Sequence, residues 1–135
     1  VYKRQTLGKT LDPITQDSCA FYERTAIFAD YDGVANGPKE GINISKALAD
    51  KDFLILQNHG ILTTGSMIDT TIWYFLNMED ACKSQLIAES VGKPIKIPHN
   101  VACNTRDYVA NDLSAFVSLQ PLLDLLWEEE KDFLD

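Results

Sequence analysis

The stretch that decides the fold is Phe53-Leu54-Ile55-Leu56, a continuous apolar run. Charged residues at 50–52 precede the run, and the polar pair Gln57-Asn58 follows it. A short apolar run with polar residues on both sides is typical of a strand that is buried on both faces of a sheet. We therefore expect residues 53–56 to form an inner strand of a sheet that helices cover.

Strand and helix patterns alternate on both sides of this run. Upstream, we expect a short helix over 14–22 after Pro13, a strand over 24–29, turns within 30–37 and a helix from Pro38 to Leu48. Downstream, we expect a strand over 61–64, a long helix from Ser66 to about Val91, and helices over about 101–109 and 113–131. This alternation predicts an α/β or mixed α+β fold in three layers.

The long helix carries two further signals. Ser66 followed by Asp69 matches a capping box and predicts where the helix begins. Apolar residues at three-and-four spacing predict its buried face: Ile68, Ile72, Phe75, Leu76, Cys82 and Leu86. Glu79 falls on this face, where an unpaired carboxylate would be costly, so we expect it to have a structural partner.

Composition limits the class of protein. The chain has 135 residues, of which 45% are hydrophobic, and a net charge of −8, which suits one folded domain. It has no basic stripe for nucleic acid, no apolar run of about 20 residues for a membrane span and no apolar leader in its first ten residues. Its three cysteines lack a paired or C-x-x-C arrangement, so we expect free thiols and a cytoplasmic protein.

Two histidines are candidates for chemistry. His59 follows the apolar strand, at the end of a sheet where open α/β proteins bind ligands, and its imidazole could bind a metal or transfer protons. Gly60 next to it would permit a backbone conformation or a close approach that a larger residue blocks. A hydrogen-bonded histidine in a turn explains the same pattern. His99 follows Pro98 and is most simply a surface residue near the start of a helix.

The histidines do not form a metal motif by themselves. Zinc needs three or four protein ligands, and the chain has no H-x-H, no H-x-x-x-H and no clustered cysteines. Ser66 lacks the G-x-S-x-G setting of a serine hydrolase, and the glycines at 33, 37 and 41 match no phosphate-binding motif. Local motifs alone therefore leave the function open.

The order of the segments nevertheless resembles a known family. Asn58-His59-Gly60 with its flanks over 56–65, followed by the helical stretch 76–86, is similar to the C-terminal half of the class II aldolase/adducin family. Residues 11–16, 33–35, 40–41, 47–48, 119–122 and 132–134 add to the similarity. The resemblance implies a three-layer α/β/α class II aldolase-like sheet, incomplete at its N-terminal side. It also implies that residues 1–135 are the C-terminal portion of a single domain.

The resemblance also implies a chemistry. Enzymes of this family hold a divalent metal ion, often zinc, with three histidines and use an acidic residue for proton transfer; the metal stabilises an enediolate during aldol cleavage or related steps. His59 aligns with the third metal ligand, whereas the H-x-H pair and the acidic residue belong to the upstream half. Whether this chain is itself an enzyme, and which residues are catalytic, therefore stays open. The implied substrate is a small sugar phosphate or a related hydroxy-carbonyl compound, and the implied assembly is a homo-oligomer, commonly a tetramer.

Two alternatives accompany this interpretation. Adducin-like members of the family serve as non-catalytic interaction domains, and an independent small-ligand-binding α/β domain would need no upstream half. Residue 1 is Val, and the only methionines are Met67 and Met78. We therefore expect the native start of the protein to lie upstream of the given sequence.

Overall fold

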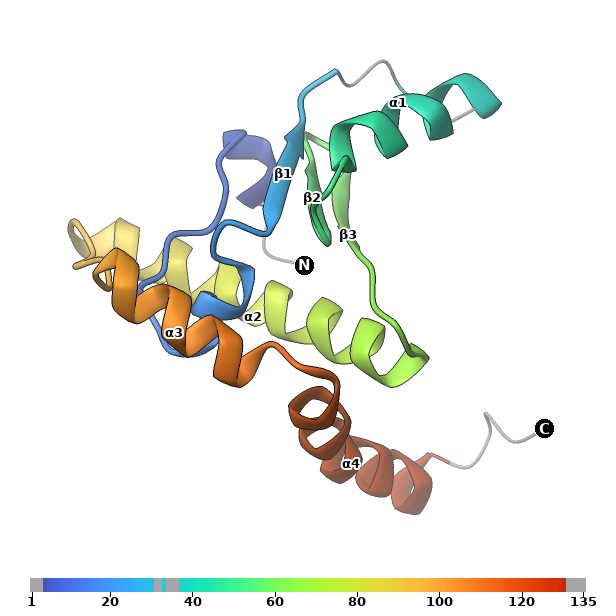
Figure 1. The fold of residues 1–135 in the computed structure, drawn as a ribbon, viewed down its shortest axis with the longest axis vertical. Coiled ribbons are helices and arrows are strands. Elements are labelled where there is room, and N and C mark those ends of the chain that lie inside the picture. Colours follow the sequence, from blue (N-terminus) through green and yellow to red (C-terminus); the bar gives the residue numbers. More distant parts are fainter. Residues whose placement is uncertain (1–3, 31–32, 34–36, 131–135) are drawn as a thin grey trace.

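The computed structural model describes residues 4–30, 33 and 37–130. In chain order its elements are the 3-10 helices η1 (Arg4–Leu7) and η2 (Asp17–Phe21), strand β1 (Thr25–Phe28), helix α1 (Pro38–Leu48), strands β2 (Phe53–Leu56) and β3 (Gly60–Thr63), and helices α2 (Ile68–Val91), α3 (His99–Val109) and α4 (Asp112–Glu129) (Figure 1). Most of the predicted turns at 30–37, and the family-like residues 132–134, lie outside the described residues.

The sheet has three strands in the order β1-β2-β3. β1 runs parallel to β2 with Thr25 opposite Phe53, and β3 runs antiparallel to β2 with Gly60 opposite Leu56. All four residues of β2 are buried, whereas those of β1 and β3 are half-buried. The prediction of an inner strand at 53–56 is therefore confirmed.

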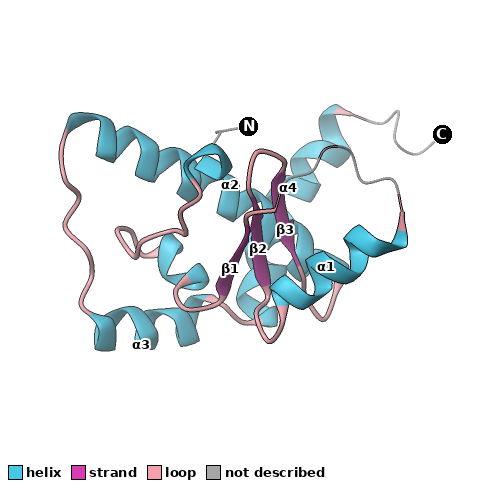
Figure 2. Cartoon of the chain, turned by 90° about the horizontal axis from the view of Figure 1, so that it is seen from above, coloured by secondary structure: helices cyan, strands magenta, loops and turns pink. Residues whose placement is uncertain are grey.

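Helices cover both faces of this sheet. α1 packs on β1 and β2, while α2 packs on β3 and on η2, and the two helices lie on opposite sides of the strands (Figure 2). α1 begins at Pro38, as predicted, because proline at a first helical position lacks only an N–H that would be unpaired there anyway. The fold is thus the expected α/β arrangement in three layers.

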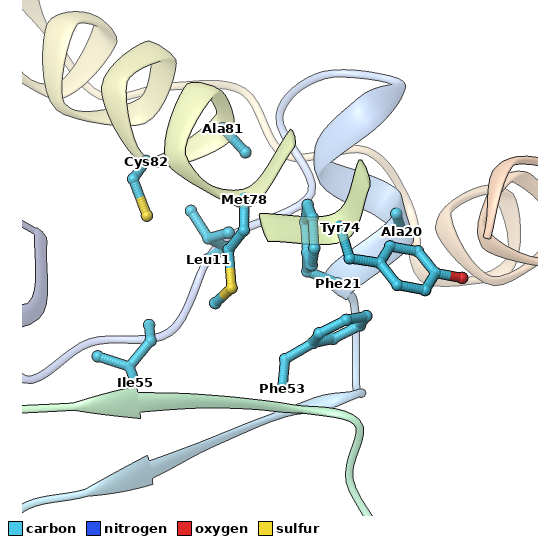
Figure 3. Close-up of a cluster of buried hydrophobic side chains, with 9 residues drawn as sticks. All are labelled: Leu11, Ala20, Phe21, Phe53, Ile55, Tyr74, Met78, Ala81 and Cys82. Atoms are coloured by element: carbon cyan, nitrogen blue, oxygen red, sulfur yellow. The ribbon is translucent and has the colours of Figure 1, made fainter. Parts of the chain in front are cut away.

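The main core lies between the sheet and α2. Side chains alternate along a strand, so Phe53 and Ile55 of β2 point to the α2 side, where they meet Tyr74 and Met78 (Figure 3). The rings of Phe53 and Tyr74 contact edge to face with centroids 4.9 Å apart. The rest of the cluster is Leu11, Ala20, Phe21, Ala81 and Cys82.

The predicted buried face of α2 is mostly wrong. Four of its apolar residues are exposed, by 77% at Ile68 and by 41–45% at the others, namely Ile72, Phe75 and Leu76. Cys82 is buried as expected, but the remaining buried residues lie on another side of the helix: Thr70, Tyr74, Met78, Ala81 and Gln85. α2 is apolar on more than one side, and spacing alone does not tell which side meets the sheet.

Two predictions of helix starts are also corrected. α2 begins after Met67 with no side-chain cap, because the Ser66 hydroxyl donates instead to Asp112 Oδ2 at 2.7 Å. Upstream, only Asp17–Phe21 is helical rather than 14–22, and it is a 3-10 helix. There the Ser18 hydroxyl accepts from the backbone N–H groups of residues 14 and 15, a local bonding pattern that competes with an α-helix.

The later helices were placed nearly correctly. α3 begins two residues before the predicted position, and α4 covers most of the predicted 113–131. The side chain of Asn111 caps α4 by accepting from the N–H of Ser114 at 2.9 Å. No helix in the described part of the chain is long and apolar enough to span a bilayer.

Candidate functional site

His59 lies in the tight turn that joins β2 to β3. The turn consists of residues 57–59, and the His59 N–H donates to the Leu56 carbonyl at 3.0 Å to close it. The Gln57 N–H donates to the Phe28 carbonyl at 2.9 Å and ties the turn to the end of β1. The histidine is exposed at the carboxyl end of the buried strand, where the sequence predicted it.

Asn58, and not Gly60, supplies the special backbone conformation of this turn. Asn58 has a φ of 59°, in the left-handed region that asparagine tolerates better than most residues. Gly60 has no such φ, and a Cβ added there would meet nothing within 4 Å. Neither the special conformation nor the close approach expected at Gly60 is present among the described residues.

His59 is not grouped with other metal ligands in the described residues. Within residues 4–30, 33 and 37–130, one group of three or more His, Cys, Asp or Glu side chains lies close enough to hold an ion, and His59 is not part of it. A site built on His59 therefore needs further ligands from elsewhere, as the sequence indicated.

The group that the structure does bring together contains Glu23, His99 and Cys103. His99 is the first residue of α3 and is exposed, as predicted. Its Nδ1 lies 3.6 Å from Glu23 Oε1, and the Cys103 Sγ lies 3.8 Å from both ring nitrogens. Sequence reasoning missed this group, because the helix was predicted to begin at about residue 101 and the four-residue spacing of His99 and Cys103 then did not place both on it.

A polar network stands beside the start of the chain. Arg4 is 1% exposed, and its Nη1 donates to Glu89 Oε2 at 3.0 Å. Gln85 donates to Glu89 Oε1 at 2.8 Å and accepts from the Asp12 N–H at 2.9 Å. Lys96 completes the network by pairing with Asp12 at 2.6 Å. These contacts fix residues 4–12 to α2.

On α2, the charge of Glu79 affects the thiol of Cys82. Glu79 is half-buried and interacts with its surroundings, in agreement with the expected partner. Burial, and then the negative charge of Glu79, raise the pKa of the Cys82 thiol to about 11. Cys82 is therefore an inert core thiol. The three cysteines are free, as predicted.

The fold corresponds to a known class of α/β proteins. The family described as "Class II Aldolase and Adducin N-terminal domain" matches residues 4–86. The decarboxylase NovR of Streptomyces niveus is 36% identical over 124 residues, which are 90% of this chain and 46% of that protein. The chain belongs to the class II aldolase and adducin family.

Solved structures agree with this assignment. The L-fuculose 1-phosphate aldolase from Glaciozyma antarctica PI12 is 34% identical with a TM-score of 0.79, over 96% of this chain and 51% of that one. An aldolase II superfamily protein from Pseudomonas syringae is 28% identical with a TM-score of 0.81, over 98% of this chain and 56% of that one. The chain thus spans about half the length of these relatives.

Proposed function

We propose that this chain is the C-terminal portion of a metal-dependent class II aldolase-like enzyme, in which His59 is one metal ligand. The substrate would be a small sugar phosphate or a related hydroxy-carbonyl compound, and the reaction aldol cleavage or a related enediolate step. The observation that carries the proposal is the exposed histidine at the carboxyl end of β2, in a fold shared with an L-fuculose 1-phosphate aldolase.

The donor chemistry of His59 fits a divalent ion. Backbone hydrogen bonds fix the turn, and the imidazole is exposed on it. It can therefore bind zinc or a similar ion without a rearrangement of the core. The described residues supply this one ligand, so the rest of the set would come from the other half of the protein. A bound divalent ion supplies Lewis acidity, which polarises a carbonyl group and stabilises an enediolate.

The role of His59 is tested with the His59→Ala variant. We expect the purified full-length protein to contain a divalent ion and to cleave L-fuculose 1-phosphate or a related sugar phosphate. His59→Ala should lose one equivalent of metal and most of the activity. His99→Ala, which removes another exposed histidine, is the matched control and should keep the activity. Unchanged activity in His59→Ala would overturn the proposal.

An adducin-like interaction domain is the second candidate. Its support is the apolar surface that α2 and β3 leave exposed, a groove of about 430 Å³ lined by residues such as Leu62, Ile72 and Phe75. Such surfaces mark interaction sites more often than random surface does. A full-length protein that binds no divalent ion and turns over no sugar phosphate would favour this function.

We further propose a cytoplasmic homo-oligomer, a tetramer by analogy with the family. Free thiols suit a reducing compartment, and α4 exposes apolar side chains that an oligomer could cover. These include Leu113 at 72%, Val117 at 57% and Trp127 at 57% exposure. The acidic chain, at −8, argues for a small-molecule substrate rather than nucleic acid. Sedimentation of the full-length protein measures the assembly.

A further inference from the structure

A second cluster of metal-type donor atoms lies at the end of the sheet opposite to His59. It consists of Glu23, His99 and Cys103, which can each offer one ligand atom so that all three lie within 4.8 Å of one another. We propose that these side chains bind a divalent ion of the zinc class. The proposal does not depend on the function proposed for His59.

The backbone brings the three donors together. His99 and Cys103 are four residues apart on α3, so one helical turn places both on the same face. Glu23 lies in the turn between η2 and β1, which the hydrogen bond from the Arg24 N–H to the Phe21 carbonyl closes at 3.2 Å. α3 packs against η2, which holds the helix beside this turn (Figure 1).

The donor atoms lie farther apart than the ligand atoms of a tetrahedral zinc site. Zinc bonds of about 2.3 Å to sulfur and about 2.0–2.1 Å to nitrogen or oxygen place the ligand atoms about 3.3–3.6 Å apart. Cys103 Sγ lies 3.8 Å from His99 Nε2 and 3.8 Å from Glu23 Oε2. The Glu23 Oε1 to His99 Nδ1 distance is 3.6 Å. One ligand atom from each residue lies within 4.8 Å of the other two, so the side chains, including the His99 ring, would have to rotate toward one another to complete the site.

Neighbouring side chains orient two of the ligands. Tyr22 Oη lies 3.2 Å from His99 Nδ1 and can accept the proton of that nitrogen, which leaves Nε2 free for the ion. Arg106 Nη1 lies 3.6 Å from Glu23 Oε2 and holds one oxygen of the carboxylate, while the other stays available. Metal-binding histidines and carboxylates are commonly supported in this way.

The donor set indicates the type of ion. One imidazole, one thiolate and one carboxylate suit a borderline ion such as Zn²⁺ or Co²⁺ better than Mg²⁺ or Ca²⁺, which prefer oxygen. His99 and Glu23 have side-chain exposures of 67% and 51%, so an ion can enter from solvent and keep a water ligand. A structural ion pair with Arg106 would explain the position of the Glu23 carboxylate. It would not explain why the thiol of Cys103 lies beside the imidazole of His99.

Cobalt binding tests the site. Titration of the purified protein with Co²⁺ should produce the near-ultraviolet charge-transfer absorption of a cobalt–thiolate bond, saturating at one equivalent. Cys103→Ser should abolish this absorption, although the free thiols of Cys19 and Cys82 remain. His59→Ala should retain it. Zn²⁺ should displace the cobalt, and it should raise the melting temperature of the wild type by more than that of Cys103→Ser.

Variants of the other residues make the test sharper. His99→Ala should weaken Co²⁺ binding more strongly than Tyr22→Phe, which should weaken it about tenfold because Tyr22 only orients the ring. Circular dichroism of each variant verifies that the fold is retained. No thiolate absorption in the folded wild type, or equal absorption in folded Cys103→Ser, would overturn the proposal.

Discussion

Replacing Glu89 by glutamine should lower the free energy of unfolding, because the buried charge on Arg4 loses its ion-pair partner. The Arg4 guanidinium is 1% exposed; its Nη1 donates to Glu89 and its Nη2 donates to the Thr10 carbonyl at 2.9 Å. Its Nε atom is buried and makes no hydrogen bond to any of the residues that the structure describes. Glutamine keeps the size of the side chain but removes the negative charge, so the variant leaves a buried cation without its ion-pair partner.

The expected loss lies between two limits. Breaking a fully buried ion pair costs about 3–5 kcal/mol, whereas an exposed pair contributes about 0–1 kcal/mol. Glu89 is 31% exposed, so water screens part of its interaction with the fully buried Arg4. We expect Glu89→Gln to lower the free energy of unfolding by about 2 kcal/mol. For a domain of this size, that loss corresponds to about 6–10 °C in melting temperature.

The loss should depend on pH. Partial burial acts to raise the pKa of Glu89, but hydrogen bonds from Arg4 and Gln85 and the charges of Arg4 and Lys9 outweigh it, so the pKa falls below its ordinary value of 4.5. A carboxyl with a lowered folded pKa adds stability above its unfolded pKa and loses it as the pH falls through the folded value. The difference between wild type and variant should therefore shrink below pH 4.5.

Urea unfolding followed by circular dichroism measures both effects. The control is Glu129→Gln, the same change at an exposed position near the end of α4, which should alter stability by less than about 0.5 kcal/mol. A Glu89→Gln variant as stable as this control at neutral pH would refute the estimate for the buried charge. A difference that persists unchanged in acid would show that the loss is not electrostatic.

Two further predictions concern packing and thiol chemistry. Gly65→Ala should destabilise the protein by about 1–3 kcal/mol, because the added Cβ would lie 2.8 Å from Thr71 Oγ1 and 3.0 Å from its backbone nitrogen. Gly92→Ala, where a Cβ meets nothing within 4 Å, is the control in the same thermal-unfolding assay. In the metal-free native protein, a thiol reagent at mildly alkaline pH should modify the half-buried Cys103 and spare Cys82, whose raised pKa and burial keep it protonated and shielded. Mass spectrometry identifies the modified residue, and rapid labelling of Cys82 would contradict this account.

The elements that were predicted well depend on local chemistry. The run at 53–56 is apolar at every position and is bounded by polar residues, and it forms a strand with those bounds. Pro38 set the start of α1 because its ring fixes a helical φ. In both cases the neighbouring residues alone determine the conformation.

The neighbouring residues do not determine which side chains of α2 are buried. Thr70 and Gln85 are polar yet buried, because they hydrogen-bond to Asp112 and to Asp12, residues that are 42 and 73 positions away in the sequence. Ile68 and Phe75 are apolar yet exposed at 77% and 43%. Helical spacing gives the positions of the apolar residues around α2. Which face of the helix is buried depends on the elements that pack against it, and the spacing does not identify these elements.

The same distinction separates the two candidate ion sites. The place of His59 followed from the general position of ligands at the ends of sheet strands, so the sequence could predict it. The cluster at Glu23 depends on α3 returning to a turn that lies 80 positions away from Cys103. The spacing of His99 and Cys103 was visible, but the third donor was not.

These two sites are far enough apart for experiments to separate them. Glu23 precedes β1 and His59 follows β2, and the strands run parallel, so the four paired residues place at least about 10 Å between the sites. At physiological salt, charges on the surface are largely screened beyond about 8 Å. His59→Ala should therefore leave the cobalt–thiolate absorption intact, and Cys103→Ser should leave aldol cleavage intact. A variant that loses both has lost its fold rather than a ligand.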